Sequence, residues 1–293
     1  MSAGKYLDNR ALAAVQTWAE AVRVKNPSAK IKVEIFAAEA GTVDGVNIVA
    51  LPGVADNVYP PQRKSFSMMR YLAEHHLEEY DWFMRLDDDA YISWPILEKL
   101  LRRLISIDLK TPLICFFRLD PSDKLYIGSP GFGKDDGDYV EEEMTYCMGG
   151  PGIVMSRELL RNLSPHLPSC LKRLYTEHED LELGRCIQVF TTEKNKKFNL
   201  FKERLQVSCI KAYEANRLFK QNYGYNKQTD EERIQYFSEL AAGSIATYHP
   251  NKEPQYQFEI HRAFKIASIS DLIAKTTKLE EENAMMTSLL NDK

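Results

Sequence analysis

A short apolar segment followed closely by three aspartates is compatible with few folds. The apolar run 82–84 is too short for a core helix and is followed, after Arg85 and Leu86, by Asp87, Asp88 and Asp89. A short run of this kind predicts a buried strand, and in α/β sheets the ends of such strands open onto ligand sites. We therefore expect a strand over 82–84 whose carboxyl end forms part of a site.

The rest of the chain alternates between helical and strand periodicity, and we find no internal repeat. This alternation predicts an α/β domain with a largely parallel or mixed sheet covered by helices. Helices are expected from the alanine-rich segment after residue 9 to residue 26, at 62–80, 96–105, 157–163 and 179–190, and strands at 31–35, 46–51, 113–117 and 153–155.

The C-terminal residues carry a different pattern. From Ile269 to Leu290, apolar residues recur at alternating spacings of three and four, with Thr276 and Asn283 interrupting the series. This heptad pattern is typical of a coiled-coil stem or linker, although an amphipathic helix folded onto the domain would show it equally well. We expect one domain over residues 1–264 and a helical tail over 265–293.

The three aspartates suggest a metal site. Adjacent carboxylates repel one another unless they are solvated, paired with cations or share a divalent ion. In an extended backbone Asp87 and Asp89 face one side and Asp88 the other, so two carboxylates could converge on magnesium or manganese. The alternative is a surface turn. A metal held by few carboxylates usually binds phosphate oxygens as well, which points to a nucleotide or phosphorylated substrate.

Three other segments have both a structural and a functional interpretation. The glycines at 149, 150 and 152 match no phosphate-binding motif and could be a plain turn or a close approach to a ligand. Glu179 and Asp180 begin a predicted helix, where they could interact with its dipole or supply a general base. His249, in a proline-bounded loop, could be a surface residue or a metal ligand.

The composition argues against several classes of protein and of binding partner. The chain has 293 residues, 44% of them hydrophobic, and a net charge of -4, which excludes disorder and argues against nucleic acid as a partner. The basic stretch 194–204 is interpreted as solvated. No apolar run approaches the roughly 18 residues that a membrane span needs, and the N-terminus lacks the order of a signal peptide. The five cysteines form no CxxC pair.

Taken together, the segments 80–91, 146–152, 179–186 and 249–252 resemble the fringe and core-1 type β1,3-glycosyltransferases. Segments 59–66 and 156–160 add to the resemblance, which extends over nearly the whole chain. The order and spacing look most like the N-terminal glucuronyltransferase domain of chondroitin synthases.

This resemblance implies a GT-A fold that uses a UDP-sugar and manganese and inverts the anomeric configuration. It makes Asp87 and Asp89 the DxD pair, with Asp89 the direct ligand, and adds His249 as a metal ligand. Asp180 would be the general base, with Glu179 as the second candidate. An acceptor-side base and a cation on the leaving diphosphate are what a single inverting displacement requires.

The resemblance also implies contacts to the donor from Asp87, Asp88, Lys64, Gly149 and Gly150. A disulfide between Cys170 and Cys186 would suit the family's lumenal setting. The expected reaction is transfer of glucuronic acid in β1,3 linkage to N-acetylgalactosamine of chondroitin. The alternatives are a β1,3-galactosyl- or N-acetylhexosaminyltransferase, a non-catalytic partner of an active synthase, and a phosphotransferase with an aspartyl nucleophile.

The chain departs from the family pattern in three respects. The family's membrane anchor and stem are not in this sequence, and neither is the hydrophobic first strand expected before Lys5. Residues 191–204 look like an insertion, and no second transferase domain follows the tail. We therefore expect part of a longer, Golgi-lumenal type II membrane protein whose partners include the UDP-sugar, a glycosaminoglycan acceptor and possible further synthase subunits.

Overall fold

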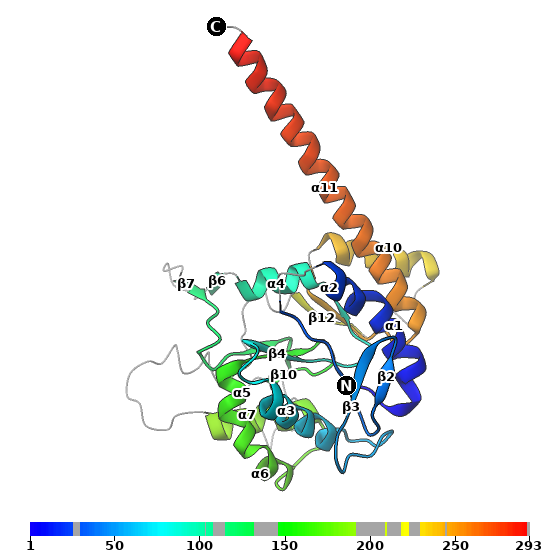
Figure 1. Ribbon diagram of the computed structural model, residues 1–293, viewed down its shortest axis with the longest axis vertical. Helices are drawn as coiled ribbons and strands as arrows, with labels where there is room; N and C mark the ends of the chain where they lie inside the picture. The colour runs from blue at the N-terminus through cyan, green and yellow to red at the C-terminus, as the bar shows by residue number, and fades with distance from the viewer. Residues whose placement is uncertain are drawn as a thin grey trace.

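The computed structural model describes residues 1–25, 30–102, 104–107, 115–131, 146–191, 209, 218–222, 229–243 and 245–291. Short strands lie at the centre of the domain, helices pack around them, and one long C-terminal helix leaves the body (Figure 1). The predicted mixed α/β character is confirmed. The basic stretch 194–204, with most of the suspected insertion, lies outside the described residues.

The N-terminal segment is helical, as its alanine content predicts. Five consecutive pieces form it: η1 (Gly4–Tyr6), η2 (Leu7–Ala11), α1 (Leu12–Ala14), η3 (Val15–Ala19) and α2 (Glu20–Lys25). Ala11 and Val15 pack against the first sheet, while Trp18 reaches a different core cluster beside the second sheet. The segment therefore contacts both sheets.

The first sheet has the order β1-β3-β2, formed by β1 (Ile35–Ala37), β2 (Gly41–Val43) and β3 (Val46–Ala50). β1 runs parallel to β3, and β2 forms a hairpin with β3 whose turn residues Asp44 and Gly45 have positive φ of 46° and 78°. Two positive φ values are typical of the tight turns that match strand twist. The strand predicted at 31–35 instead begins at Ile35, and in this register residues 31 and 32 extend beyond the start of β3.

The second sheet has the order β4-β11-β8 and carries the predicted acidic strand. It consists of β4 (Trp82–Arg85), β8 (Tyr126–Gly128) and β11 (Ile153–Ser156), with β11 antiparallel to both neighbours. Side chains of β4 alternate between two cores: Phe83 packs in one, and Trp82 and Met84 in the other. β4 is therefore covered on both faces, as its apolar run predicts.

The third group of strands brings distant segments together. β5 (Tyr91–Ile92) pairs with β13 (Thr247–His249), which pairs with β12 (Phe219–Gln221). Two further pairs are β9 (Pro130–Gly131) with β10 (Tyr146–Cys147), and β6 (Leu104–Ile107) with β7 (Cys115–Arg118). Among the described strands only β1–β3 and β12–β13 are parallel. The expectation of a largely parallel sheet is therefore wrong here, because periodicity identifies strands but not their direction.

Helices α3 (Gln62–His76), α5 (Arg157–Leu163), α6 (Leu167–Leu171) and α7 (Glu179–Thr191) pack together over the second sheet, and η4 (Ser164–His166) links α5 to α6. α5 begins where the sequence predicts, since the Ser156 hydroxyl accepts a hydrogen bond of 3.2 Å from the Leu159 amide. α4 (Trp94–Arg102) ends earlier than predicted, because residues 104–107 form β6. α10 (Asp230–Ala242), capped by Thr229, was not predicted.

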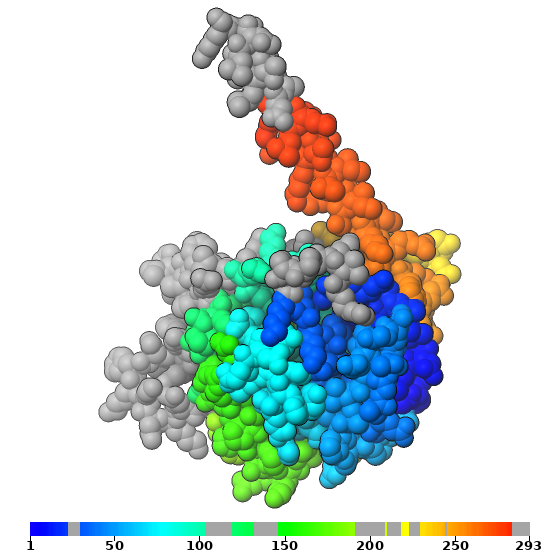
Figure 2. Space-filling view, viewed as in Figure 1, coloured from blue at the N-terminus to red at the C-terminus, as the bar shows by residue number. Residues whose placement is uncertain are grey.

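The C-terminal helix α11 (Pro254–Asn291) is one uninterrupted element that contains the expected boundary between residues 264 and 265. Its first turns pack on α10, and there Gln257 donates a hydrogen bond of 2.9 Å to the Ala90 carbonyl. From Ile266 onward the helix projects from the domain, and Ile269, Leu272 and Leu279 of the heptad pattern are exposed (Figure 2). The side chains described in this arm therefore do not fold back onto the domain.

Two disulfides tie the domain together. Cys170 bonds to Cys186 and joins α6 to α7, which confirms the pairing that the family resemblance implies. Cys147 at the end of β10 bonds to Cys209, a pairing the sequence did not suggest. In the described part of the chain, no helix has the length and apolar character required to span a bilayer.

Candidate active site

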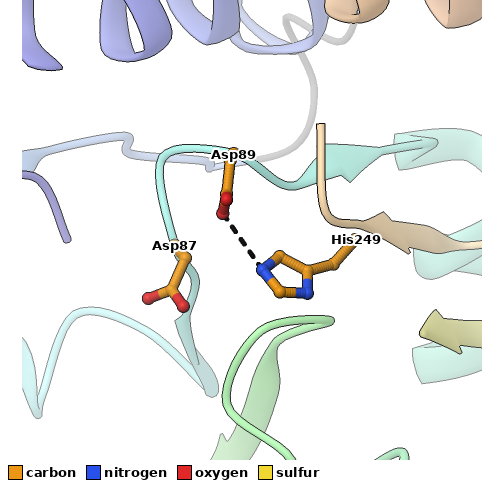
Figure 3. A group of neighbouring side chains, drawn as sticks. All are labelled: Asp87, Asp89 and His249. Atoms are coloured by element: carbon orange, nitrogen blue, oxygen red, sulfur yellow. Dashed lines mark ion pairs between the residues drawn. The ribbon is translucent and has the colours of Figure 1, made fainter. Parts of the chain in front are cut away.

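A metal-capable cluster lies where β4 and β13 end. One oxygen of Asp87, one of Asp89 and one nitrogen of His249 lie within 4.8 Å of one another. Asp87 and Asp89 extend from the loop after β4, and His249 reaches toward them from β13 (Figure 3). The β5–β13 pairing, which sets Tyr248 opposite Tyr91, brings His249 beside the aspartates that precede β5.

The two aspartates converge because of a turn rather than an extended backbone. β4 ends at Arg85, and the Ala90 amide donates to the Asp87 carbonyl at 3.3 Å, which closes a turn over residues 87–90. The Asn251 amide donates to the Asp89 carbonyl at 2.5 Å and holds the turn against the segment after β13. The predicted separation of Asp88 from the other two is confirmed, although its cause is different.

The hydrogen bonds around His249 suit a metal ligand. Its Nδ1 lies 2.8 Å from Gln221 Oε1, and its Nε2 lies 3.1 Å from Asp89 Oδ1. When Nδ1 carries the hydrogen and donates it to Gln221 Oε1, a neutral imidazole has a lone pair at Nε2. This lone pair faces Asp89 Oδ1, which is also an acceptor. Two acceptors at this separation need a proton or a cation between them. The donor set therefore fits a divalent ion held by two carboxylates and one imidazole.

Positive neighbours keep Asp89 ionised. Burial acts to raise the pKa of Asp89, but its contact with His249 outweighs this effect, with help from the charge of Arg10, whose Nη1 lies 3.9 Å from Asp89 Oδ2. The pKa is held below its ordinary value. A carboxylate that stays charged when buried is what a cation site requires.

Asp88 and Lys64 lie apart from this cluster and contact the N-terminus. Asp88 accepts a hydrogen bond of 2.6 Å from the Ser2 hydroxyl, and burial raises its pKa to about 6. The Lys64 ammonium donates to the Ser2 carbonyl at 2.6 Å and forms an ion pair with Asp56. The contacts described for these two side chains are therefore with the chain itself.

Arg85 connects the two acidic segments and was not predicted as a site residue. Its Nη1 lies 3.3 Å from Asp87 Oδ1, and its Nη2 donates to Glu179 Oε2 at 2.6 Å. Glu179 also accepts a hydrogen bond from the Ser65 hydroxyl. The signal for Arg85 was present in the sequence, because an arginine closing a strand that is buried on both faces needs anionic partners.

Glu179 and Asp180 differ in accessibility. Glu179 is buried, and burial raises its pKa although the charge of Arg85 opposes that shift. Asp180 is only half-buried, and its two oxygens accept from the amides of Gly149 and Leu181, each at 3.0 Å. A carboxylate oxygen has two lone pairs, so Asp180 can still accept a proton.

The glycine-rich turn fills the space between the metal cluster and Asp180. A Cβ at position 149 would lie 2.9 Å from Arg85 Cζ, and one at position 150 would lie 2.8 Å from His249 Nε2. Gly152 has a φ of 102°, which side chains rarely allow. Gly149 and Gly150 therefore allow the backbone to approach the side chains of Arg85 and His249, and their predicted approach to a ligand stays a prediction.

A mixed α/β domain whose strand ends gather two aspartates and a histidine is compatible with a glycosyltransferase. Residues 166–293 match the family described as chondroitin N-acetylgalactosaminyltransferase. The chain is a relative of the chondroitin synthases, a group of β1,3-glycosyltransferases.

Three relatives show the extent of this kinship. Human chondroitin sulfate synthase 3 is 38% identical over 99% of this chain. Mouse chondroitin sulfate synthase 2 is 27% identical over 73% of the chain, and human chondroitin sulfate glucuronyltransferase is 25% identical over 75%. The chain spans 29%, 23% and 24% of the length of these three relatives, respectively.

Proposed function

We propose that this chain binds a UDP-sugar with a divalent cation and transfers the sugar, with inversion, to a chondroitin acceptor. The observation that carries the proposal is the convergence of Asp87, Asp89 and His249 at the end of a buried strand. Kinship with the chondroitin synthases supports the substrate class.

Asp87, Asp89 and His249 would hold the cation, which we take to be manganese. A bound divalent ion neutralises the charge that develops on the diphosphate leaving group. Gln221 fixes the imidazole of His249, and Arg10 adds positive charge beside Asp89. The glycine-rich turn lets the backbone lie close to this centre, where Gly149 and Gly150 would face the donor sugar or the acceptor.

Asp180 is proposed as the general base. It would take the proton from the acceptor hydroxyl as that oxygen bonds to the anomeric carbon and the bond to the UDP oxygen breaks. Glu179 is the weaker candidate because Arg85 and Ser65 already engage its two oxygens. We propose that Glu179 and Arg85 position Asp87 and the start of α7.

The sugar we favour is glucuronic acid, added in β1,3 linkage to N-acetylgalactosamine. The resemblance to the glucuronyltransferase domain and the kinship with a chondroitin sulfate glucuronyltransferase support it. Transfer of N-acetylgalactosamine is the second candidate, because the family that matches residues 166–293 is described by that activity. We further propose a Golgi-lumenal setting in a longer membrane protein, with residues 265–293 as a linker or coiled-coil arm.

A panel of UDP-sugars tests the proposal. The chain is incubated with manganese and either a chondroitin oligosaccharide ending in N-acetylgalactosamine or one ending in glucuronate. We expect transfer from UDP-glucuronate to the first acceptor. Transfer from UDP-N-acetylgalactosamine to the second would establish the alternative instead. Absence of UDP binding by the folded protein, measured by calorimetry with manganese, would contradict both and favour a non-catalytic partner.

A further inference from the structure

The turn that carries Asp87 and Asp89 is held by a segment far along the chain. The Asp89 carbonyl accepts a hydrogen bond of 2.5 Å from the Asn251 amide. At the other end of the same peptide, the Ala90 amide donates to the Asp87 carbonyl at 3.3 Å. The next carbonyl, that of Ala90, accepts a hydrogen bond of 2.9 Å from Gln257 Nε2. Two of these three bonds therefore come from the segment that follows β13.

The same distant segment also supplies a member of the metal-capable cluster. His249 is the last residue of β13, and Gln257 lies in the first turn of α11. Asn251 and Gln257 are both fully buried. Residues 249–257 thus contribute one candidate metal ligand and two hydrogen bonds to the backbone around another, Asp89. The relative position of the two ligands therefore depends on how this one segment is docked.

Gln257 stands where an apolar side chain would suit the packing. It shares a buried face of α11 with Ile260, three residues on. Among the described residues, its buried Oε1 atom has no hydrogen-bond partner, so only the nitrogen side of the carboxamide is satisfied. A buried polar atom without a partner lowers stability. A methionine of similar length would avoid that cost, so what the glutamine adds is the bond from its Nε2 to the Ala90 carbonyl.

The base of α11 is itself anchored to the domain. Glu259 accepts two hydrogen bonds from the guanidinium of Arg233 in α10, at 2.7 and 3.1 Å. Ile260 is buried in the same apolar cluster as Tyr91 of β5. These contacts give Gln257 a fixed support, which a side chain needs if it is to orient a group of the site.

We infer that Gln257 is a positioning residue for the cation site and that cation binding is linked to the docking of the base of α11. The inference rests on the proposal that Asp87, Asp89 and His249 hold a divalent cation. Binding by all three side chains requires the 87–90 turn in one arrangement, and the Gln257 bond favours that arrangement in advance. Because linkage between two sites is reciprocal, the bound cation should in turn stabilise the helix base.

Manganese binding to the full chain tests the inference without a sugar donor. Gln257→Met keeps the length of the side chain and removes the hydrogen-bond donor. We expect the dissociation constant for manganese, measured from the EPR signal of the free ion, to rise about 10-fold, a typical coupling between linked sites. The matched control is Gln255→Met, in the same turn of α11, where Gln255 is exposed and bonds to Glu259. It should leave the constant unchanged.

Unfolding in urea separates this role from a merely structural one. Without manganese, we expect Gln257→Met to unfold at nearly the same urea concentration as the unsubstituted chain. The Ala90 carbonyl loses a donor, but the partnerless oxygen of Gln257 is removed at the same time. A fall in the unfolding midpoint together with an unchanged manganese constant would make Gln257 structural and would overturn the inference.

Hydrogen exchange tests the reciprocal effect and does not depend on a variant that folds. In the unsubstituted chain, saturating manganese should slow backbone exchange at residues 257–264 by at least about threefold, because opening of the helix base would weaken binding. Residues 270–282 of the exposed arm are the internal control and should not respond. In Gln257→Met the slowing should be lost.

The outcomes distinguish this inference from the proposal on which it rests. Manganese binding that leaves exchange at residues 257–264 unchanged would overturn the linkage and leave the cation site in place. Failure of the unsubstituted chain to bind manganese would contradict the cation site, and this inference with it.

Discussion

In each of two pairs of adjacent acidic residues, the two members lie in different environments although the sequence presents them alike. In Asp88-Asp89 the first residue contacts Ser2 and the second belongs to the metal cluster. In Glu179-Asp180 the first is buried against Arg85 and the second remains half-exposed beside the glycine-rich turn. One member of each pair stabilises the fold, and the other faces the site. Adjacency in sequence therefore does not imply shared chemistry.

Substitution of Asp89 should give the largest effect. Asp89→Ala removes a carboxylate from the proposed cation site, and we expect transfer to fall by at least about 10³-fold because transition-state charge is no longer neutralised. Manganese-dependent UDP binding, measured by calorimetry, should be lost with it. Asp271→Ala, on the exposed arm of α11, is the matched control. Retained metal-dependent binding in Asp89→Ala would show that the cluster does not bind the cation.

Substitution of Asp180 should separate binding from chemistry. We expect Asp180→Asn to leave UDP and manganese binding intact and to lower turnover by about 10²- to 10⁴-fold, the usual contribution of a general base. Single-turnover assays at saturating donor measure this directly. The exposed neighbour Glu177→Gln serves as the control. Near-normal turnover in Asp180→Asn would move the base to Glu179 or to another group.

Substitution of Arg85 tests the connection between the two pairs. Arg85→Lys keeps the positive charge. A lysine, however, lacks the two guanidinium nitrogens that contact Asp87 and Glu179 at the same time. We expect turnover to fall about 10-fold and stability by about 2 kcal/mol, since a buried pair loses its geometry but not its charge. Urea unfolding and steady-state kinetics measure the two effects. A fall in stability with unchanged turnover would make Arg85 purely structural.

Substitution of Asp88 should have the smallest effect on catalysis. Its carboxyl contacts Ser2 rather than the cluster, and an asparagine can still accept the Ser2 hydrogen bond, so Asp88→Asn should change turnover less than about threefold. Transfer assays with varied manganese give the comparison with Asp89→Ala. A shift in the manganese requirement as large as that of Asp89→Ala would erase the distinction between the two aspartates.

The sequence predicted elements whose signal is local. The strand at 82–84 and the helix at 157–163 appear where expected, because an apolar run and a serine cap act over a few residues. It could not predict the direction of the strands or the late start of β1, which depend on partners distant in the chain. The same limit explains why the contacts of Gln221 and Ser65 were missed.

The residues of the candidate site also divide into those that local sequence identified and those whose position depends on distant contacts. The grouping of Asp87 with Asp89 was predicted from an extended backbone, yet a turn closed by Ala90 produces it. His249 was assigned by family resemblance alone, because its proximity depends on the β5–β13 ladder. Lys64 was expected from the family resemblance to contact the donor; its described contacts are with Asp56 and Ser2, and the donor contact stays a prediction.

The base of α11 gives the long helix a mechanical connection to the metal cluster. Gln257 holds the Ala90 carbonyl, one residue from Asp89, and His261 Nδ1 lies 3.1 Å from the Tyr91 hydroxyl. The exposed arm and these two contacts belong to one uninterrupted helix, so a displacement of the base of α11 would also displace the backbone next to Asp89.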